Sequence, residues 1–129
     1  MADRLLFSLV SPARELYHGE VEHVVAPGTD GEFGVLPHHA PFMSTLKNGL
    51  VKVLEGNTVN MRVFVRGGFA DVTPDGLTIL AEEAHNLADV TPEDLSKEIE
   101  TVRYSLEKEP DNPAFSERLT YLDAMQKAL

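Results

Sequence analysis

The chain has 129 residues, 43% of them hydrophobic, which is enough for one ordinary domain or for a compact domain with an appended element. Its formal charge of −10 divides into −6 over residues 1–89 and −4 over residues 90–129, so we expect no nucleic acid among its partners. The absence of cysteine excludes disulfides, thiolate catalysis and zinc-thiolate sites.

Nothing in the sequence predicts a membrane span or a secretory leader. No apolar run approaches the roughly 18 residues that a spanning helix requires. The first residues, MADRLLFSLVSPAR, lack a basic segment leading into a long apolar one. We therefore expect the chain to stay in the cytosol or an equivalent compartment.

Up to about residue 88, apolar residues recur at every second position, as expected for half-buried strands. The clearest case is the alternating run of Val59, Met61, Val63 and Val65. His23 is in register with Val21 and Val25, which predicts a core or sheet-face histidine. Closely spaced turn signals, such as Pro27-Gly28 and Asp30-Gly31, separate the strands. The pattern favours two packed antiparallel sheets, or a small barrel, of about eight to ten strands.

From Thr91 onward the hydrophobic period becomes helical. Thr91-Pro92-Glu93-Asp94 places a hydroxyl at the N-cap, proline at the first helical position and acids in the first turn. The run EPDNP at residues 109–113 ends this helix and caps a second one. Their apolar stripes are Leu95, Ile99, Val102 and Leu106, then Phe115, Leu119, Leu122 and Met125. The short joint predicts an antiparallel hairpin, so we place the domains at residues 1–88 and 89–129.

The segment most typical of a functional surface is VEHVVAPGTDGEFGVLPHHAPFMSTLK, residues 21–47. Three glycines between residues 28 and 34 give access to unusual backbone angles, and Pro37 and Pro41 bracket a short histidine-containing loop. A stiff exposed loop loses little entropy when a protein docks on it. The alternative interpretation is a plain connection between strands. Phe42 and Met43 could join such an interface, although burial in the sandwich is the first expectation.

The sequence contains little that supports catalysis. The five histidines include no i, i+4 pair, so we expect no metal site, and residues 28–34 lack the ending of a phosphate-binding loop. Glu82 and Glu83 are neighbours on a predicted strand, where adjacent side chains face opposite sides. A β-sandwich that binds a small ligand and a small hydrolase using Asp71 or Glu83 remain as alternatives.

A resemblance to a known family covers about Leu5 to Ala84. The runs VVAPGTDGEFGVLPHHAPFMSTLKNGLVKV and FVRGGFADVTPDGLTILAEEA resemble the epsilon subunit of bacterial F-type ATP synthases, called delta in mitochondria. The motifs G-x-x-G-x-x-G-x-x-P-x-H-A-P, L-K-x-G, G-G-F-A-x-V and L-A-E-E-A occur in that order. The resemblance implies an N-terminal β-sandwich and a C-terminal helical hairpin, the organisation that the periodicities predict independently.

The resemblance also implies a non-catalytic role, without a cofactor, in the central rotor of the proton-translocating synthase. The sandwich would hold the gamma subunit and rest on the ring of c subunits, at the cytoplasmic face of the bacterial inner membrane. The hairpin could reach the alpha and beta subunits, and membrane association would come only through the complex. By motif position, the partner-binding residues would be Glu32 and His39, with Asp30, Phe33 and His38 beside them.

The hairpin departs from relatives that inhibit hydrolysis with basic helices or bind ATP through an I/L-D-x-x-R-A motif. Here the corresponding region reads LADVTPEDLSKEIE, without an arginine at the required offset. Residues 91–109 hold three basic side chains against six acids. Such helices would gain little from an acidic target. We expect weak or absent inhibition of hydrolysis and no tight ATP binding.

Overall fold

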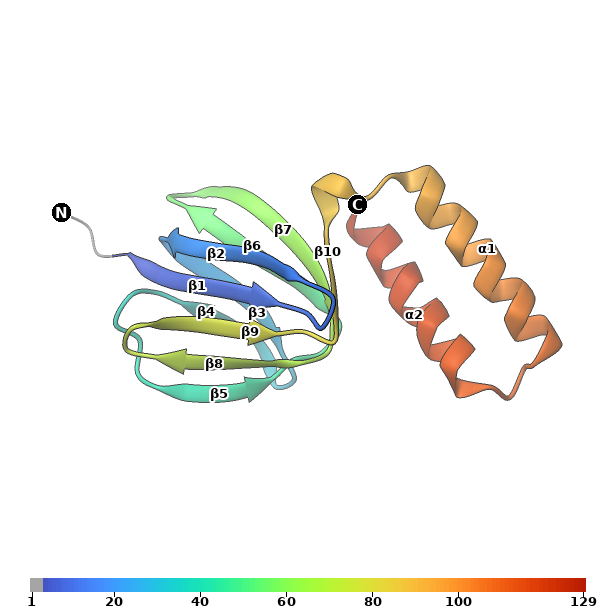
Figure 1. Cartoon of the computed structure of the whole chain (residues 1–129), viewed down its shortest axis with the longest axis horizontal. Helices are drawn as coiled ribbons and strands as arrows, with labels where there is room; N and C mark the ends of the chain where they lie inside the picture. Colours follow the sequence, from blue (N-terminus) through green and yellow to red (C-terminus); the bar gives the residue numbers. More distant parts are fainter. Residues whose placement is uncertain (1–3) are drawn as a thin grey trace. The chain divides into compact units, whose positions relative to one another are not determined.

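The computed structural model describes residues 4–129 and divides into two compact units, Met1–Leu87 and Ala88–Leu129. Within the described residues, the first unit contains ten β-strands in two sheets and the second contains two α-helices (Figure 1). A short 3-10 helix, Leu87–Asp89, lies at the division. The predicted fold class, a ten-stranded β-sandwich followed by a helical hairpin, is confirmed.

Each sheet of the sandwich has five strands. Sheet A has the order β2 (Glu15–Val21), β1 (Leu5–Val10), β9 (Gly76–Leu80), β8 (Phe69–Thr73) and β5 (Phe42–Thr45). Sheet B has the order β10 (Glu83–Asn86), β7 (Thr58–Arg66), β6 (Gly49–Glu55), β3 (His23–Gly28) and β4 (Gly31–Val35). Neighbouring strands are antiparallel except β1 and β9, which run parallel.

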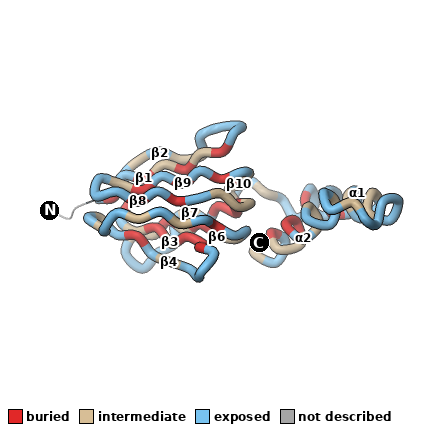
Figure 2. Tube along the Cα trace, turned by 90° about the horizontal axis from the view of Figure 1, so that it is seen from below, coloured by how far each residue is buried: buried red, intermediate tan, exposed pale blue. Residues whose placement is uncertain are grey.

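The core lies between the two sheets and is filled by alternate side chains of both. Figure 2 shows buried and exposed positions alternating along the strands. In β7, Val63 and Val65 are fully buried as the period predicts, but Val59 is 43% exposed. A bulge between Val53 and Leu54 of β6 shifts the register of β7, and Val59 lies beyond it. Burial of apolar area of this kind is the main favourable contribution to folding.

The chain passes from sheet A to sheet B at Glu22. Before this point odd-numbered residues face the core, and in β3 even-numbered residues do. Val21 ends β2 and is 1% exposed, whereas Val24 and Ala26 are the fully buried residues of β3. His23 and Val25 are half-buried on the outer face of sheet B. His23 is therefore a sheet-face histidine, one of the two predicted placements, and it and Val25 do not share the buried side of Val21 because the chain changes sheets between them.

A polar clasp joins the sheets at one end of the sandwich. Arg4 Nη1 donates to Glu55 Oε2 at 3.0 Å, and Arg4 Nη2 donates to the carbonyl oxygen of Glu20 at 2.9 Å. Glu20 belongs to β2 of sheet A and Glu55 to β6 of sheet B. The hydrogen bond from the Arg4 guanidinium lowers the pKa of the Glu55 carboxyl below its ordinary value.

The second unit is a hairpin of α1 (Pro92–Lys108) and α2 (Pro113–Ala128). The predicted caps are present: Thr91 Oγ1 accepts from the Asp94 amide at 3.2 Å, and Asn112 Oδ1 accepts from the Ala114 amide at 3.0 Å. Arg118 also donates to Glu98 across the two helices at 2.6 Å. The predicted stripes supply the buried residues Leu95, Ile99, Leu122 and Met125, to which the structure adds Tyr121.

Candidate functional site

The turn between β3 and β4 has a shape that requires glycine at both ends. A Cβ atom on Gly28 would lie 2.7 Å from the carbonyl oxygen of Gly31 and 2.9 Å from the ring of Phe33. Gly31 has a φ of 133°, a region that other residues rarely adopt. The glycine-rich segment therefore encodes one particular tight turn, which presents Thr29 and Asp30 at its tip.

This turn belongs to sheet B but is also bound to the end of β5 in sheet A. The Thr29 amide donates to the Thr45 carbonyl at 3.1 Å, and the two threonine hydroxyl groups lie 2.9 Å apart. The Lys47 amide donates to the Pro27 carbonyl at 3.0 Å. The turn is thus held on two sides, as a docking surface with a fixed shape requires.

The loop between β4 and β5, residues 36–41, carries the two histidines. Its backbone folds back on itself through a bond from the His39 amide to the Leu36 carbonyl at 3.3 Å. His38 has a φ of 64°, the left-handed conformation. The His38 side chain is exposed, and the His39 side chain is half-buried.

An aromatic cluster packs against this loop. The rings of Phe33 and Phe42 meet edge-on with centroids 5.3 Å apart, and the ring of His39 lies 5.1 Å from that of Phe42. Phe33 is on β4 of sheet B and Phe42 is on β5 of sheet A, so the cluster also bridges the two sheets. Phe42 is half-buried, whereas Met43, for which burial was also expected, is 66% exposed.

The acidic residues of the site are exposed. Asp30 is at the turn tip, and Glu32 lies 3.6 Å from the Lys52 ammonium on β6. β3 lies between β4 and β6, and Lys52 reaches across it. Lys52 was not among the predicted site residues. It is twenty positions from Glu32 in the sequence, and the two come together because β4 and β6 both pair with β3. We call the whole set the docking site: Asp30, Glu32, Phe33, His38, His39, Phe42 and Lys52.

The structure thus brings only some of the predicted residues into mutual contact. Phe33 and His39 meet through Phe42, and Glu32 meets Lys52. Asp30 and His38 are exposed at two separate turns of the same surface segment. Phe42 begins β5 directly after Pro41. Its position next to the loop is the only feature of the sequence that indicates that Phe42 could support the loop.

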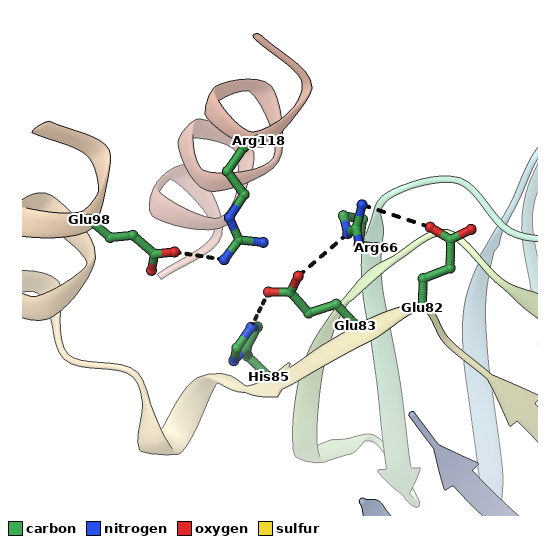
Figure 3. A network of polar contacts seen from close by, with 6 residues as sticks. All are labelled: Arg66, Glu82, Glu83, His85, Glu98 and Arg118. Atoms are coloured by element: carbon green, nitrogen blue, oxygen red, sulfur yellow. Dashed lines mark hydrogen bonds and ion pairs between the residues drawn. The ribbon is translucent and has the colours of Figure 1, made fainter. Parts of the chain in front are cut away.

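The neighbouring acids Glu82 and Glu83 form a separate cluster on the sandwich. Both approach the Arg66 side chain, at 3.9 Å and 3.4 Å, and Glu83 lies 2.6 Å from His85 Nε2 (Figure 3). Glu83 is therefore engaged by a guanidinium and an imidazole. The pairs lie along β10, an edge strand of sheet B, so this cluster is a charge-paired edge. The Arg118–Glu98 pair in the same figure belongs to the hairpin.

The outer face of sheet A carries the largest group of exposed apolar side chains among residues 4–129. Strand register places Val10, Leu80 and Phe69 in one row across β1, β9 and β8. Leu80 and Phe69 are 41% and 38% exposed, and with Val10 and Pro12 they line a depression of about 480 Å³. Leu6 and Met43 extend the same face. We call these residues the outer apolar face: Leu6, Val10, Pro12, Met43, Phe69 and Leu80.

Residues 4–129 contain no group of three or more histidine, aspartate or glutamate side chains arranged to hold a metal ion. Neither α1 nor α2 has the length and apolar character that crossing a membrane demands.

Residues 4–87 match the family described as ATP synthase, Delta/Epsilon chain, beta-sandwich domain. The ATP synthase epsilon chain of Hyphomonas neptunium is 56% identical, and the match covers 100% of this chain and 98% of the relative. The chain belongs to the ATP synthase delta/epsilon family. The resemblance expected from the sequence motifs is confirmed.

Other members of the delta/epsilon family show how much of the chain is shared. The epsilon chain of Maricaulis maris is 52% identical over 80% of this chain and 77% of its own length. The epsilon chain of Caulobacter vibrioides is 61% identical over 63% of this chain, which is 93% of that relative. The Caulobacter relative is therefore about a third shorter than this chain.

A solved structure agrees with the fold of both units. A chain of the mitochondrial ATP synthase of Euglena gracilis, in an assembly of OSCP, F1 and c-ring, superposes with a TM-score of 0.78 at 22% identity. The superposition covers 99% of this chain and 82% of the Euglena chain. At that identity the likeness shows the fold alone.

Proposed function

We propose that this protein is the epsilon subunit of a bacterial F-type ATP synthase. In that role it is a non-catalytic part of the central rotor, which transmits rotation of the c-ring through gamma to the distant sites of ATP synthesis. The observation that carries the proposal is the 56% identity to an epsilon chain over 100% of this chain and 98% of that relative. A mechanical coupler requires rigidity and interface area, and the hydrogen-bonded, glycine-dependent turn of the docking site supplies a rigid contact.

The docking site is the proposed contact with the c-ring. Its acids and histidines are the residues to which the family resemblance assigns partner contact, and they lie in and on either side of β4, the edge strand that meets β5 of the other sheet through the Phe33–Phe42 contact. Exposed carboxylate contacts with basic ring-loop groups are worth about 1 kcal/mol or less each. Several weak contacts on a rigid support therefore act together.

The outer apolar face is the proposed contact with gamma. Its rows of exposed apolar side chains would leave water on docking, and burial of apolar surface contributes about 25 cal/mol per Å². Large exposed apolar patches on soluble proteins are typical of protein interfaces. This face and the docking site are both parts of the sandwich, so one rigid unit could bind gamma and the ring together.

The hairpin has a smaller role in this proposal. Its described residues carry more acids than bases, so it gains little from acidic segments of the catalytic subunits. We infer weak or absent inhibition of hydrolysis by the hairpin, and no tight ATP binding. The complex would hold the protein at the cytoplasmic face of the inner membrane, as a peripheral subunit.

A small-ligand β-sandwich is the weaker alternative. The depression on the outer apolar face would have to serve as its pocket, but its exposed Phe69 and Leu80 side chains suit a protein surface better than an enclosed ligand. The family membership also does not favour a stand-alone binding module.

Reconstitution tests the proposal directly. Membrane vesicles carrying the synthase are depleted of this chain and then supplied with the full-length protein, and ATP-driven proton pumping is followed with a pH-sensitive dye. We expect pumping to fall on depletion and to return on addition. Pumping and ATP synthesis that stay at full strength without the chain would contradict the coupling role.

A further inference from the structure

We propose that Phe42 and the Ala40 carbonyl hold His39 in the tautomer with its proton on Nδ1, so that the docking site offers hydrogen-bond acceptors to its partner. The inference rests on the proposed contact with the c-ring and specifies the chemistry of that contact. It makes Phe42 a positioning residue and His39 Nε2 the contacting atom.

The tautomer follows from the hydrogen bond that His39 makes. Its Nδ1 lies 2.8 Å from the Ala40 carbonyl oxygen. A carbonyl oxygen can only accept, so the proton of this bond must be on Nδ1. In a neutral imidazole the other ring nitrogen, Nε2, is then an acceptor with a free lone pair.

Phe42 fixes the plane of the imidazole ring. The two ring centroids are 5.1 Å apart and the planes are inclined by 58°, so the benzene ring limits rotation of the histidine about its side-chain bonds. Phe42 is itself fixed by the edge-on contact with Phe33 on the other sheet. The histidine is therefore oriented by a contact between β4 and β5, the two edge strands that the loop connects.

His39 Nε2 and the Glu32 carboxylate are both hydrogen-bond acceptors. A carboxylate accepts hydrogen bonds and donates none when ionised. Glu32 is exposed, and its carboxylate lies 3.6 Å from the Lys52 ammonium. An acceptor at each of these two positions suits a partner that supplies donors, such as guanidinium or amide groups. A loop of ionised carboxylates would offer a donor to neither group.

The first test is spectroscopic and uses the full-length chain labelled with ¹⁵N histidine. Two-bond ¹⁵N–¹H spectra at pH 8 distinguish a protonated Nδ1 from a protonated Nε2. We expect His39 to show a protonated Nδ1 in the wild-type protein and in Phe42→Tyr. In Phe42→Leu we expect an average of both forms. A wild-type His39 with its proton on Nε2 would overturn the inference, whatever the binding results are.

The second test measures binding of the full-length chain, in complex with gamma, to the detergent-solubilised c-ring. We expect Phe42→Leu to bind about five- to tenfold more weakly, since one oriented contact is worth about 1 kcal/mol. Phe42→Tyr should restore binding. Phe115→Leu is the matched control, because Phe115 is also half-buried but lies on α2. We expect this control to bind as the wild type does.

The outcomes separate this inference from the proposed function. If the wild-type complex does not bind the ring, the proposed contact fails while the tautomer result stands by itself. If the wild type binds and a folded Phe42→Leu binds equally well, Phe42 does not position the contact and the inference is wrong.

Discussion

Arg4 holds Glu55 across 51 positions of sequence, with one guanidinium nitrogen 3.0 Å from the carboxylate oxygen Oε2. The same guanidinium also binds the Glu20 carbonyl, so a single side chain joins the first strand pair of sheet A to the end of β6 in sheet B. The two sheets are thus tied by a charge-assisted contact at this end and by aromatic rings near the docking site.

We predict that the contribution of this pair to stability disappears in acid. The folded-state pKa of Glu55 lies below its ordinary value of 4.5, with the Arg4 hydrogen bond as the largest cause. A carboxyl group whose pKa is lowered by folding stabilises the folded chain at pH values above the pKa it has in the unfolded chain. This stabilisation is lost as the pH falls through the pKa of the folded state. The free energy of unfolding of the wild-type protein should therefore exceed that of Glu55→Gln at pH 7. The two values should converge at low pH. Urea unfolding of both proteins at several pH values checks this, and Asp71→Asn serves as the control. A difference that does not change with pH would contradict the prediction.

We predict that Gly28→Ala destabilises the sandwich by about 1 to 3 kcal/mol, because overpacking against backbone is not easily relieved. The added Cβ would lie 2.7 Å from the Gly31 carbonyl oxygen and 2.9 Å from the Phe33 ring. Gly19→Ala is the matched control, since its nearest neighbour is the flexible end of Tyr17 at 3.3 Å. Chemical unfolding compares the two variants. Equal stability of both would show that the turn is not as tight as its geometry indicates.

We predict that Leu80→Glu weakens binding of gamma by at least tenfold and leaves the fold intact. The side chain is 41% exposed in the middle of the outer apolar face, so a charge there loses solvation when a partner covers it. Val59→Glu replaces an apolar side chain of similar exposure, 43%, on the other sheet and should bind normally. Co-elution with purified gamma measures both. Normal binding by Leu80→Glu would place the gamma contact elsewhere.

We predict that a chain ending at Asp89 keeps a folded sandwich and supports coupling, without strong activation of hydrolysis. The division into units at Leu87 and Ala88 and the short Caulobacter vibrioides relative both support this expectation. Hydrolysis rates of synthase reconstituted with the full or shortened chain provide the measurement. Calorimetry of the full-length chain with ATP should show no micromolar affinity. Strong activation, or tight ATP binding, would refute the weak-regulation proposal.

Local patterns in the sequence predicted the elements well, because alternation and capping depend on near neighbours. Val63 and Val65 on β7, Thr91 before α1 and Asn112 before α2 are all where the pattern placed them. The change of sheet at Glu22 could not be read locally, and it put Val24 rather than Val25 in the core.

The docking site was predictable as a segment but not as a set of contacts. The motif identified Glu32 and His39, yet Lys52 and Phe42 join them only through strand order and the meeting of two sheets. Exposure of Met43 also depends on tertiary structure, because β5 is an edge strand whose outer side no described element of the sandwich covers.

The parallel pairing of β1 with β9 has a consequence for biosynthesis. β1 leaves the ribosome before its neighbour in the middle of sheet A, β9 (Gly76–Leu80), which is made some seventy residues later. Until then β1 can pair only with β2, which leaves one side of β1 without hydrogen-bond partners. Closure of the sandwich must therefore wait for almost the entire first unit to be translated, which makes the growing chain a natural client for chaperones.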